Sequence, residues 1–281
     1  MDQHAHTNPL KKYFRQYAMY LKIPGTNFGY SPDIITFTDS GEVGIMPMTG
    51  KDELILKNPD ALLNGEAIIE VIKSCVPAVK DPKRLLNNDI DALITAIRHC
   101  TYGHALESSV TCPKCEEENT YKLDLMYALE NMTFLDESYV VNLDSGLSVF
   151  VKPYGFPELL AGLHAQFEQA KLTKALESAE MSEEERLKIF SAAFSKLTHT
   201  THSLLADSVI SIVDESSNIH VTDRRDIGEF LANISKHELD LIFELINRIN
   251  QIGIKKNFSI TCSKCNHTWQ SNMDFNPANF S

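Results

Sequence analysis

Two short cysteine segments, far apart in the chain, most constrain what this sequence can fold into. The first contains Cys112 and Cys115 and the second contains Cys262 and Cys265, with two residues between the cysteines of each pair. Each pair follows a β-branched residue and lies where a tight turn between two strands is expected. A CxxC turn supplies two thiolates from one loop, and two such turns complete the shell of a tetrahedral zinc ion. The sequence therefore predicts a structural zinc site with these four cysteines as ligands.

Other readings of the cysteines fit less well. Buried or disulfide-paired cysteines are the plain alternative, and a redox pair would open a helix in a βαβ setting, which neither segment does. A catalytic zinc would keep an open position for water, whereas four thiolates close the site. The sequence contains no metalloprotease, nucleophile-elbow or P-loop pattern, and we expect no enzymatic activity and no catalytic residues.

The spacing of the two cysteine pairs is unusual. An ordinary zinc ribbon separates its pairs by about 15–20 residues, whereas Cys115 and Cys262 are 147 positions apart (262 − 115). We expect a ribbon formed jointly by residues 110–125 and 260–275. One ion bound by both pairs would close a very long loop, and it should matter to the architecture of the whole chain.

Composition indicates a soluble protein with a sizeable core. The chain has 281 residues, of which 43% are hydrophobic and 23% are charged, as in ordinary globular proteins. No apolar run is long enough to cross a bilayer, and the amino terminus lacks a signal-peptide core. We therefore expect no membrane partner and a reducing cytoplasm. In such a compartment, we interpret Cys75 and Cys100 as small buried core residues.

The formal charge of −12 argues against a nucleic-acid partner. Binding to phosphate needs clustered Lys and Arg, but 38 acidic residues outnumber 26 basic ones. The first cysteine pair is followed directly by the acidic run 116–118. Such a run would repel a phosphate backbone.

The pattern along the chain predicts an α+β fold that is mostly helical. Residues 1–32 are expected to form an extended amino-terminal arm, which packs on a neighbouring subunit, packs on its own domain or is mobile. Two β-hairpins are predicted at 33–48 and 138–152, each with a glycine in its turn. Apolar periodicity predicts helices at 51–56, 66–74, 90–102, 223–232 and 236–252. Thr49 or Asp52 is expected to cap the helix at 51–56, and Asn88 and Asp89 the helix at 90–102. The apolar stretch 207–215 is expected to extend a preceding helix.

The chain also repeats its order of elements. A hairpin, helices and a cysteine pair occur in residues 33–130, and they occur again in residues 131–281. Gly103 and Gly253 each precede the first cysteine of their half by nine positions. We hypothesise an internal duplication about a pseudo-two-fold axis, with an acidic helical insertion near 168–205 in the second half. Chance similarity of short turns is the alternative.

Four further side chains are weaker candidates. His199 and His202 are spaced three apart on an expected helix, but exposed histidines at this spacing seldom bind a metal. His267 could replace a cysteine ligand, although it suits an exposed turn better. Trp269 is the single tryptophan of the chain, and it either packs on the zinc hairpin or serves as an anchor for a partner.

A family resemblance rests on residues 50–60, Gly65, the segment 89–91 with Arg98, and Tyr102–Gly103 before the first cysteine pair. These residues resemble the baseplate hub subunits and hub assembly proteins of T-even-type contractile-tail phages. The resemblance implies a structural or assembly role in the virion tail baseplate, after a period in the host cytoplasm. It implies hub or tail-tube proteins as partners, and a homo-oligomer is also compatible with it.

Two functions are compatible with these observations. The first is a zinc-stapled interaction protein of the phage baseplate hub. The alternative is a cytosolic zinc-ribbon adaptor or regulatory protein that contacts nucleic acid or a polymerase. Salt-dependent binding to DNA or RNA would favour the second, and assembly together with tail proteins would favour the first.

Overall fold

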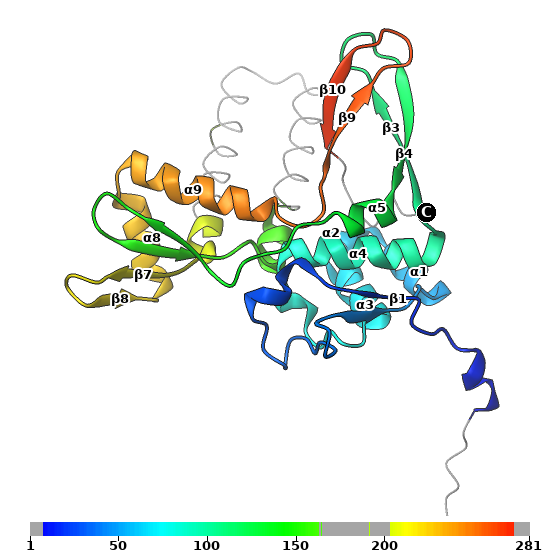
Figure 1. The fold of residues 1–281 in the computed structure, drawn as a ribbon, viewed down its shortest axis with the longest axis horizontal. Helices are drawn as coiled ribbons and strands as arrows, with labels where there is room; N and C mark the ends of the chain where they lie inside the picture. Colours follow the sequence, from blue (N-terminus) through cyan, green and yellow to red (C-terminus); the bar gives the residue numbers. More distant parts are fainter. Residues whose placement is uncertain (1–7, 163, 165–190, 192–202, 273–281) are drawn as a thin grey trace, which may run out of the picture.

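A computed structural model of the chain describes residues 8–162, 164, 191 and 203–272. It shows an α+β protein with helices, small antiparallel sheets and two hydrophobic cores, which confirms the predicted fold class. A pair of long hairpins rises from the body of the molecule (Figure 1). Among the described residues, no helix combines the length and the apolar content that a bilayer span requires. The predicted insertion near 168–205 lies almost entirely outside the described residues.

The first core surrounds two helices that the apolar periodicity predicted. On α3, Ile68, Val71 and Ile72 share one face and are buried, and α4 buries Leu93 and Ile97 in the same way. Burial of such side chains stabilises the fold by about 1.5–3 kcal/mol each. The first part of the chain contains these elements: η1 (Pro9–Tyr13), β1 (Met19–Leu21), η2 (Pro24–Phe28), β2 (Val43–Ile45), α1 (Gly50–Leu56), α2 (Pro59–Leu63), α3 (Glu66–Cys75), η3 (Pro82–Arg84), α4 (Asn87–Tyr102) and α5 (Leu125–Glu130).

The caps of these helices were predicted with mixed success. Thr49 caps α1 in a capping box, because its hydroxyl accepts from the backbone N–H of Asp52 while the Asp52 carboxylate accepts from the N–H of Thr49. The predicted caps of α4 are wrong. This helix begins at Asn87 without a side-chain cap. The carboxylate of Asp89 lies buried in the core instead.

The first predicted hairpin, at 33–48, is also wrong in its pairing. Its turn is present, since the backbone N–H of Thr38 donates to Glu42 O at 2.9 Å. However, β2 pairs with β1 from the amino-terminal segment. The residues before the turn form hydrogen bonds with the loop after α3: the N–H of Thr36 donates to Ala78 O. Long-range partners therefore replaced the local strand pairing that the sequence pattern indicated.

The amino-terminal segment divides into two parts. Residues 19–30 pack against their own domain: Leu21 and Ile23 are buried, and the carbonyl of Pro24 accepts from the N–H of Leu135. Residues 9–13 leave the body of the molecule (Figure 1). Residues 19–30 thus pack on their own domain, which was one of the alternatives for this segment.

The second core lies between a four-stranded antiparallel sheet and two helices. Val149 and Ile212 lie opposite each other on neighbouring strands, and Ile242 of α9 packs in the same cluster. The second predicted hairpin is confirmed as β5 and β6, and the last two predicted helices are confirmed as α8 and α9. The elements are β5 (Tyr139–Asn142), β6 (Ser148–Val151), β7 (Val209–Asp214), β8 (Ile219–Val221), α8 (Arg224–Asn233) and α9 (Lys236–Asn250).

The helix predicted through residues 207–215 is wrong. The stretch forms strand β7, which pairs with β6 and β8. Four of its six residues are Val or Ile, and β-branched side chains pack well on a pleated sheet. A short apolar run is ambiguous between helix and strand, and here the neighbouring strands decide the outcome.

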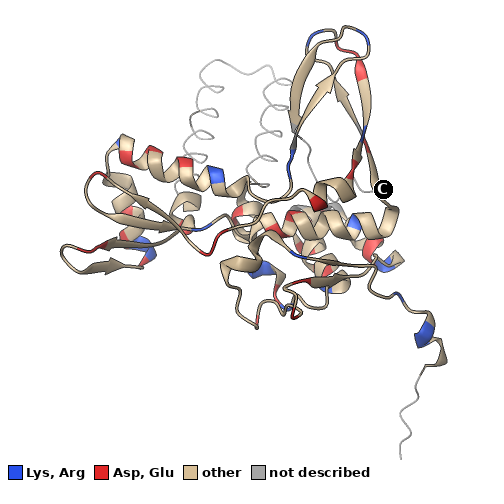
Figure 2. Cartoon of the chain, viewed as in Figure 1, with Lys and Arg blue, Asp and Glu red and all other residues tan. Residues whose placement is uncertain are grey.

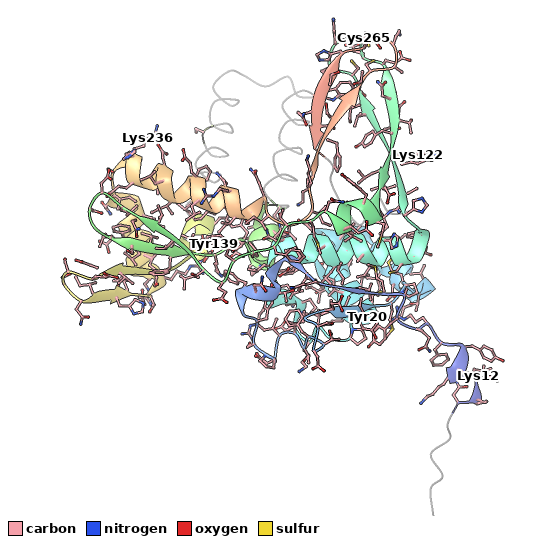
Figure 3. The ribbon with its side chains drawn as sticks, in the orientation of Figure 1. Lys12, Tyr20, Lys122, Tyr139, Lys236 and Cys265 are labelled. Carbon is pink, nitrogen blue, oxygen red and sulfur yellow. The ribbon has the colours of Figure 1, made fainter. Side chains whose placement is uncertain are left out.

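Two antiparallel hairpins form the projection above the first core, and we call them the tower. One hairpin is β3 (Ala105–Thr111) with β4 (Glu118–Asp124), and the other is β9 (Asn257–Thr261) with β10 (Thr268–Asn272). They come from distant parts of the chain and stand side by side (Figure 1). Figure 3 places Cys265 at the tip, at the end of the tower that is remote from both cores.

Candidate metal centre

Each hairpin of the tower ends in a tight turn that carries its two cysteines. In the first turn, the N–H of Cys112 donates to Glu117 O at 2.8 Å, and the N–H of Glu116 donates to Cys112 O at 3.0 Å. Glu116 has a φ of 59°. This left-handed conformation, uncommon for a residue other than glycine, reverses the chain immediately after Cys115.

The second turn repeats this geometry residue for residue. The N–H of Cys262 donates to His267 O at 2.9 Å, and the N–H of Asn266 donates to Cys262 O at 3.1 Å. Asn266 has a φ of 53°. Every position in the second turn is 150 higher than its counterpart in the first, and the strand pairing of the two hairpins shifts by the same number.

The two turns bring all four predicted sulfurs together. The ligand atoms lie within 4.8 Å of one another. The Sγ atoms of Cys112 and Cys265 are 3.7 Å apart, and those of Cys115 and Cys262 are 3.6 Å apart. These distances are too long for a disulfide. They match the edge of about 3.8 Å that a tetrahedron with metal–sulfur bonds of about 2.3 Å requires.

A buried amide joins the two turns beside the sulfurs. Asn119 on β4 is only 7% exposed. Its Oδ1 accepts from the N–H of Ser263 at 2.9 Å, and its Nδ2 donates to the Sγ of Cys262 at 3.6 Å. On the surface nearby, Lys264 and Glu117 form an ion pair at 2.6 Å. Contacts between side chains therefore align the turns in addition to any shared ion.

The cluster favours ionisation of one thiol over another. The backbone N–H of Cys265 and the amide of Asn119 help to lower the pKa of Cys262 to about 6. At Cys115 the backbone N–H of Glu117 lowers the pKa, but burial and the neighbouring sulfurs outweigh it and raise the pKa to about 12. Four negative charges at these distances repel one another. A divalent cation supplies the charge that would let all four thiols bind as thiolates.

The remaining predicted candidates lie as follows. His267 stacks on Trp269, with ring centroids 6.1 Å apart and planes 10° apart, and both are half-buried on the second hairpin. This contact is the packing that was one of the two alternatives for Trp269. His199 and His202 lie outside the described residues.

Sequence reasoning missed two side chains that organise the structure. Asn119 occupies the position that corresponds to Trp269 in the second hairpin (119 + 150), and no pattern marks it as a partner of sulfur. Asp89 was assigned to a helix cap, but its Oδ1 accepts from the N–H of Gly25 at 2.6 Å and its Oδ2 accepts from the Tyr30 hydroxyl at 2.5 Å. Both contacts depend on tertiary structure.

Comparison with curated proteins and with solved structures gave no significant match. A protein-family model described as T4 bacteriophage base plate protein matches residues 31–280, which is most of the chain. The match includes the second core, both hairpins of the tower and all of the first core except the amino-terminal residues Leu21 and Ile23. The family is one of baseplate proteins, which places the protein in the phage virion tail. The chain therefore belongs to the T4 bacteriophage base plate protein family.

Proposed function

We propose that the protein is a structural or assembly component of the baseplate hub and that it acts through contacts with other hub or tail-tube proteins. The observation that carries this proposal is the family match over residues 31–280. No step in this role requires catalysis, so we propose that the protein is not an enzyme.

We further propose that Cys112, Cys115, Cys262 and Cys265 hold a structural zinc ion. The support is the set of sulfur–sulfur distances, which fit one tetrahedral ion, and the choice of four thiolates, which leaves no position for a reacting water. When bound, the ion would supply positive charge and fix the two turns. Asn119 would orient the Cys262 sulfur.

We also propose that the halves 33–130 and 131–281 arose by duplication. The constant shift of 150 between the two turns supports it. So does a second shift, of 105, between two other turns: Gly41 N–H donates to Thr38 O, and Gly146 N–H donates to Leu143 O, both at 2.9 Å. In an experimental structure, one rotation should superpose both pairs of turns; two unrelated rotations would contradict the duplication.

The nucleic-acid adaptor is the weaker alternative. Lys and Arg are scattered along the described helices and strands, among acidic residues (Figure 2). At the tip of the tower, Lys264 is engaged by Glu117, and the net charge of the chain is −12. Salt-dependent binding needs a concentrated basic surface. Retention of DNA or RNA that weakens steeply with added salt would favour this alternative.

The hub role can be tested in an infected host. Phage that lacks the gene should produce heads without completed tails, and the wild-type gene supplied in trans should restore tails. Purified virions examined with an antibody against the protein would show whether it stays in the particle. Normal tails in the absence of the gene would overturn the proposal, whatever the state of the metal site.

A further inference from the structure

The residues that leave the body of the molecule form an exposed apolar and basic segment. Three side chains of this stretch, Leu10, Tyr13 and Phe14, are exposed, and Tyr13 is 73% accessible. Residues 8–20 contain three basic residues and no acidic residue, in a chain with a formal charge of −12. We call residues 8–14 the arm. Contiguous apolar exposure of this kind marks a site of protein contact.

The root of the arm is fixed. The guanidinium of Arg15 donates to Pro47 O at 2.7 Å, to the Asp52 carboxylate at 3.2 Å, and to the carbonyl and hydroxyl oxygens of Ser74 at 2.6 and 2.7 Å. These contacts hold Arg15 beside α1 and the end of α3. From this point the arm runs away from the body (Figure 1), and Figure 3 shows Lys12 on it. It therefore reaches outward and leaves the surface of its own domain uncovered.

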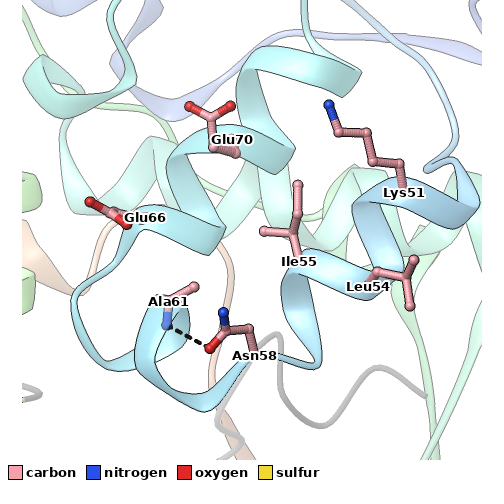
Figure 4. A pocket seen from close by; sticks show the side chains of 7 residues that line it. All are labelled: Lys51, Leu54, Ile55, Asn58, Ala61, Glu66 and Glu70. Atoms are coloured by element: carbon pink, nitrogen blue, oxygen red, sulfur yellow. Dashed lines mark hydrogen bonds between the residues drawn. The ribbon is translucent and has the colours of Figure 1, made fainter.

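A groove on the same chain has the complementary character. The groove lies between α1, α2 and α3 and has a volume of about 320 Å³. Its floor and one wall are apolar, with Leu54 71% exposed to solvent. Glu66 and Glu70 stand on the opposite wall, as Figure 4 shows, while Lys51 stands on the α1 side. Glu70 is paired with Lys73 on its own helix at 3.6 Å, so Glu66 is the carboxylate offered to a basic partner. The full lining is Lys51, Leu54, Ile55, Asn58, Ala61, Glu66 and Glu70.

We propose that the arm of one copy docks in the groove of a second copy. The apolar side chains of the arm would cover Leu54, and Lys11 or Lys12 would lie near Glu66, on the side of the groove away from Lys51. Arg15 would fix the angle at which the arm leaves the first copy. If two copies exchange arms reciprocally, the contact closes a two-fold dimer; if the contact runs one way, repetition closes a ring or continues as a filament. This inference depends on neither the metal nor the hub role.

The test is the mass of the full chain in solution, measured by light scattering over a range of concentrations. The wild type is expected to associate with itself. Leu54→Asp, which places a charge in the groove, and the double change Tyr13→Ser with Phe14→Ser, which removes the anchors of the arm, should each weaken association at least about tenfold. Ile219→Asp, a matched change at an exposed apolar side chain on β8, should leave association unchanged.

Mixing the two variants distinguishes docking between copies from other arrangements. One variant retains an intact arm and the other an intact groove, so the mixture should form a one-to-one complex although neither variant associates alone. A wild type that is monomeric throughout would overturn the proposal. So would a mixture that forms no complex, which is the result expected if the arm folds onto its own groove or binds another protein.

Discussion

At the scale of single residues, three polar side chains whose contacts the sequence did not predict hold distant segments together. Asn119 connects the two cysteine turns, Asp89 connects α4 to the amino-terminal segment, and Arg15 ties the root of the arm to α1 and α3. Each is buried or half-buried, where an unsatisfied polar group costs about 1–3 kcal/mol. Each can be tested by a single substitution.

Asn119→Leu is expected to weaken zinc binding by roughly 10–100-fold, the usual effect of losing an outer-shell partner. The change removes the N–H donor to Cys262 Sγ and the acceptor for Ser263. Competition with a chromophoric chelator measures the affinity. Thr120→Leu on the same strand is the control, because that side chain is exposed and points away from the sulfurs. Equal affinities for the two variants would contradict a role for Asn119.

Asp89 should make the stability of the protein depend on pH in an unusual direction. Burial raises its pKa to about 7, although hydrogen bonds from Tyr30 and Gly25 partly oppose this. The ordinary Asp value is about 3.9, so between about pH 4 and pH 7 the folded state holds a proton that the unfolded state has lost. The Asp89 contribution to the free energy of unfolding should therefore fall as pH rises through this window.

Urea unfolding of the wild type and of Asp89→Asn across this range measures that contribution. Asn cannot titrate, so the stability of the wild type minus that of the variant should decline with rising pH and level off above about pH 7. A difference that is constant with pH would show that Asp89 has an ordinary pKa.

Arg15→Ala should destabilise the protein by about 2 kcal/mol, because hydrogen bonds from a charged donor contribute roughly 1.5–3 kcal/mol. The change leaves the Asp52 carboxylate, which is nearly buried, without its cation. Arg84→Ala is the control, since the Arg84–Asp33 pair is exposed and such pairs contribute at most about 1 kcal/mol. Equal chevron or urea midpoints for the two variants would refute the anchoring role.

At the scale of elements, helical periodicity was read correctly, whereas the pairing of β2 and β7 with their neighbouring strands was not. The periodicity of Ile68, Val71 and Ile72 predicted α3, and Thr49 was one of the two caps expected at the start of α1. These signals depend on neighbours three or four positions apart. The stretch 207–215 carries the same kind of apolar signal, but its strand conformation depends on β6 and β8, which the local sequence does not contain.

The candidate metal centre shows the same division. The cysteine spacing predicted which four sulfurs meet, because a CxxC turn fixes the geometry of each pair by itself. The amide that joins the turns could not be predicted. Asn119 is close to the sulfur of Cys262 only after two strands 143 positions apart stand side by side.

At the scale of the whole molecule, the two hydrophobic cores and the tower are built from different residues. The four cysteines lie at the tip of the tower, and the first core contacts the tower below this tip, through the buried Leu106 and Leu123 and the partly buried Tyr121 and Phe258. A shared ion would therefore fix the tower most directly, since the cores have their own apolar packing. The sequence led us to expect that the ion governs the architecture of the whole chain.

Removal of the metal by a chelator should consequently loosen the tower and leave the cores folded. Amide hydrogen exchange should quicken in β3, β4, β9 and β10 and stay slow in α3 and α4. Cys112→Ser should have the same effect and abolish stoichiometric zinc. Cys100→Ser, at a cysteine outside the cluster, should retain one zinc ion per chain. Global unfolding on chelation would show that the cores depend on the ion.

The distance along the chain between the two cysteine turns has a consequence for the order of events on the ribosome. Cys112 and Cys115 are translated about 150 residues before the second pair exists. At roughly 5–20 residues per second, the nascent chain carries only the first two of the four cysteines for on the order of ten seconds. During that interval the first pair can hold a cation only through two sulfurs. Coordination of a metal by all four sulfurs is therefore possible only after the second turn has been translated. A prematurely terminated product would lack the second pair of cysteines.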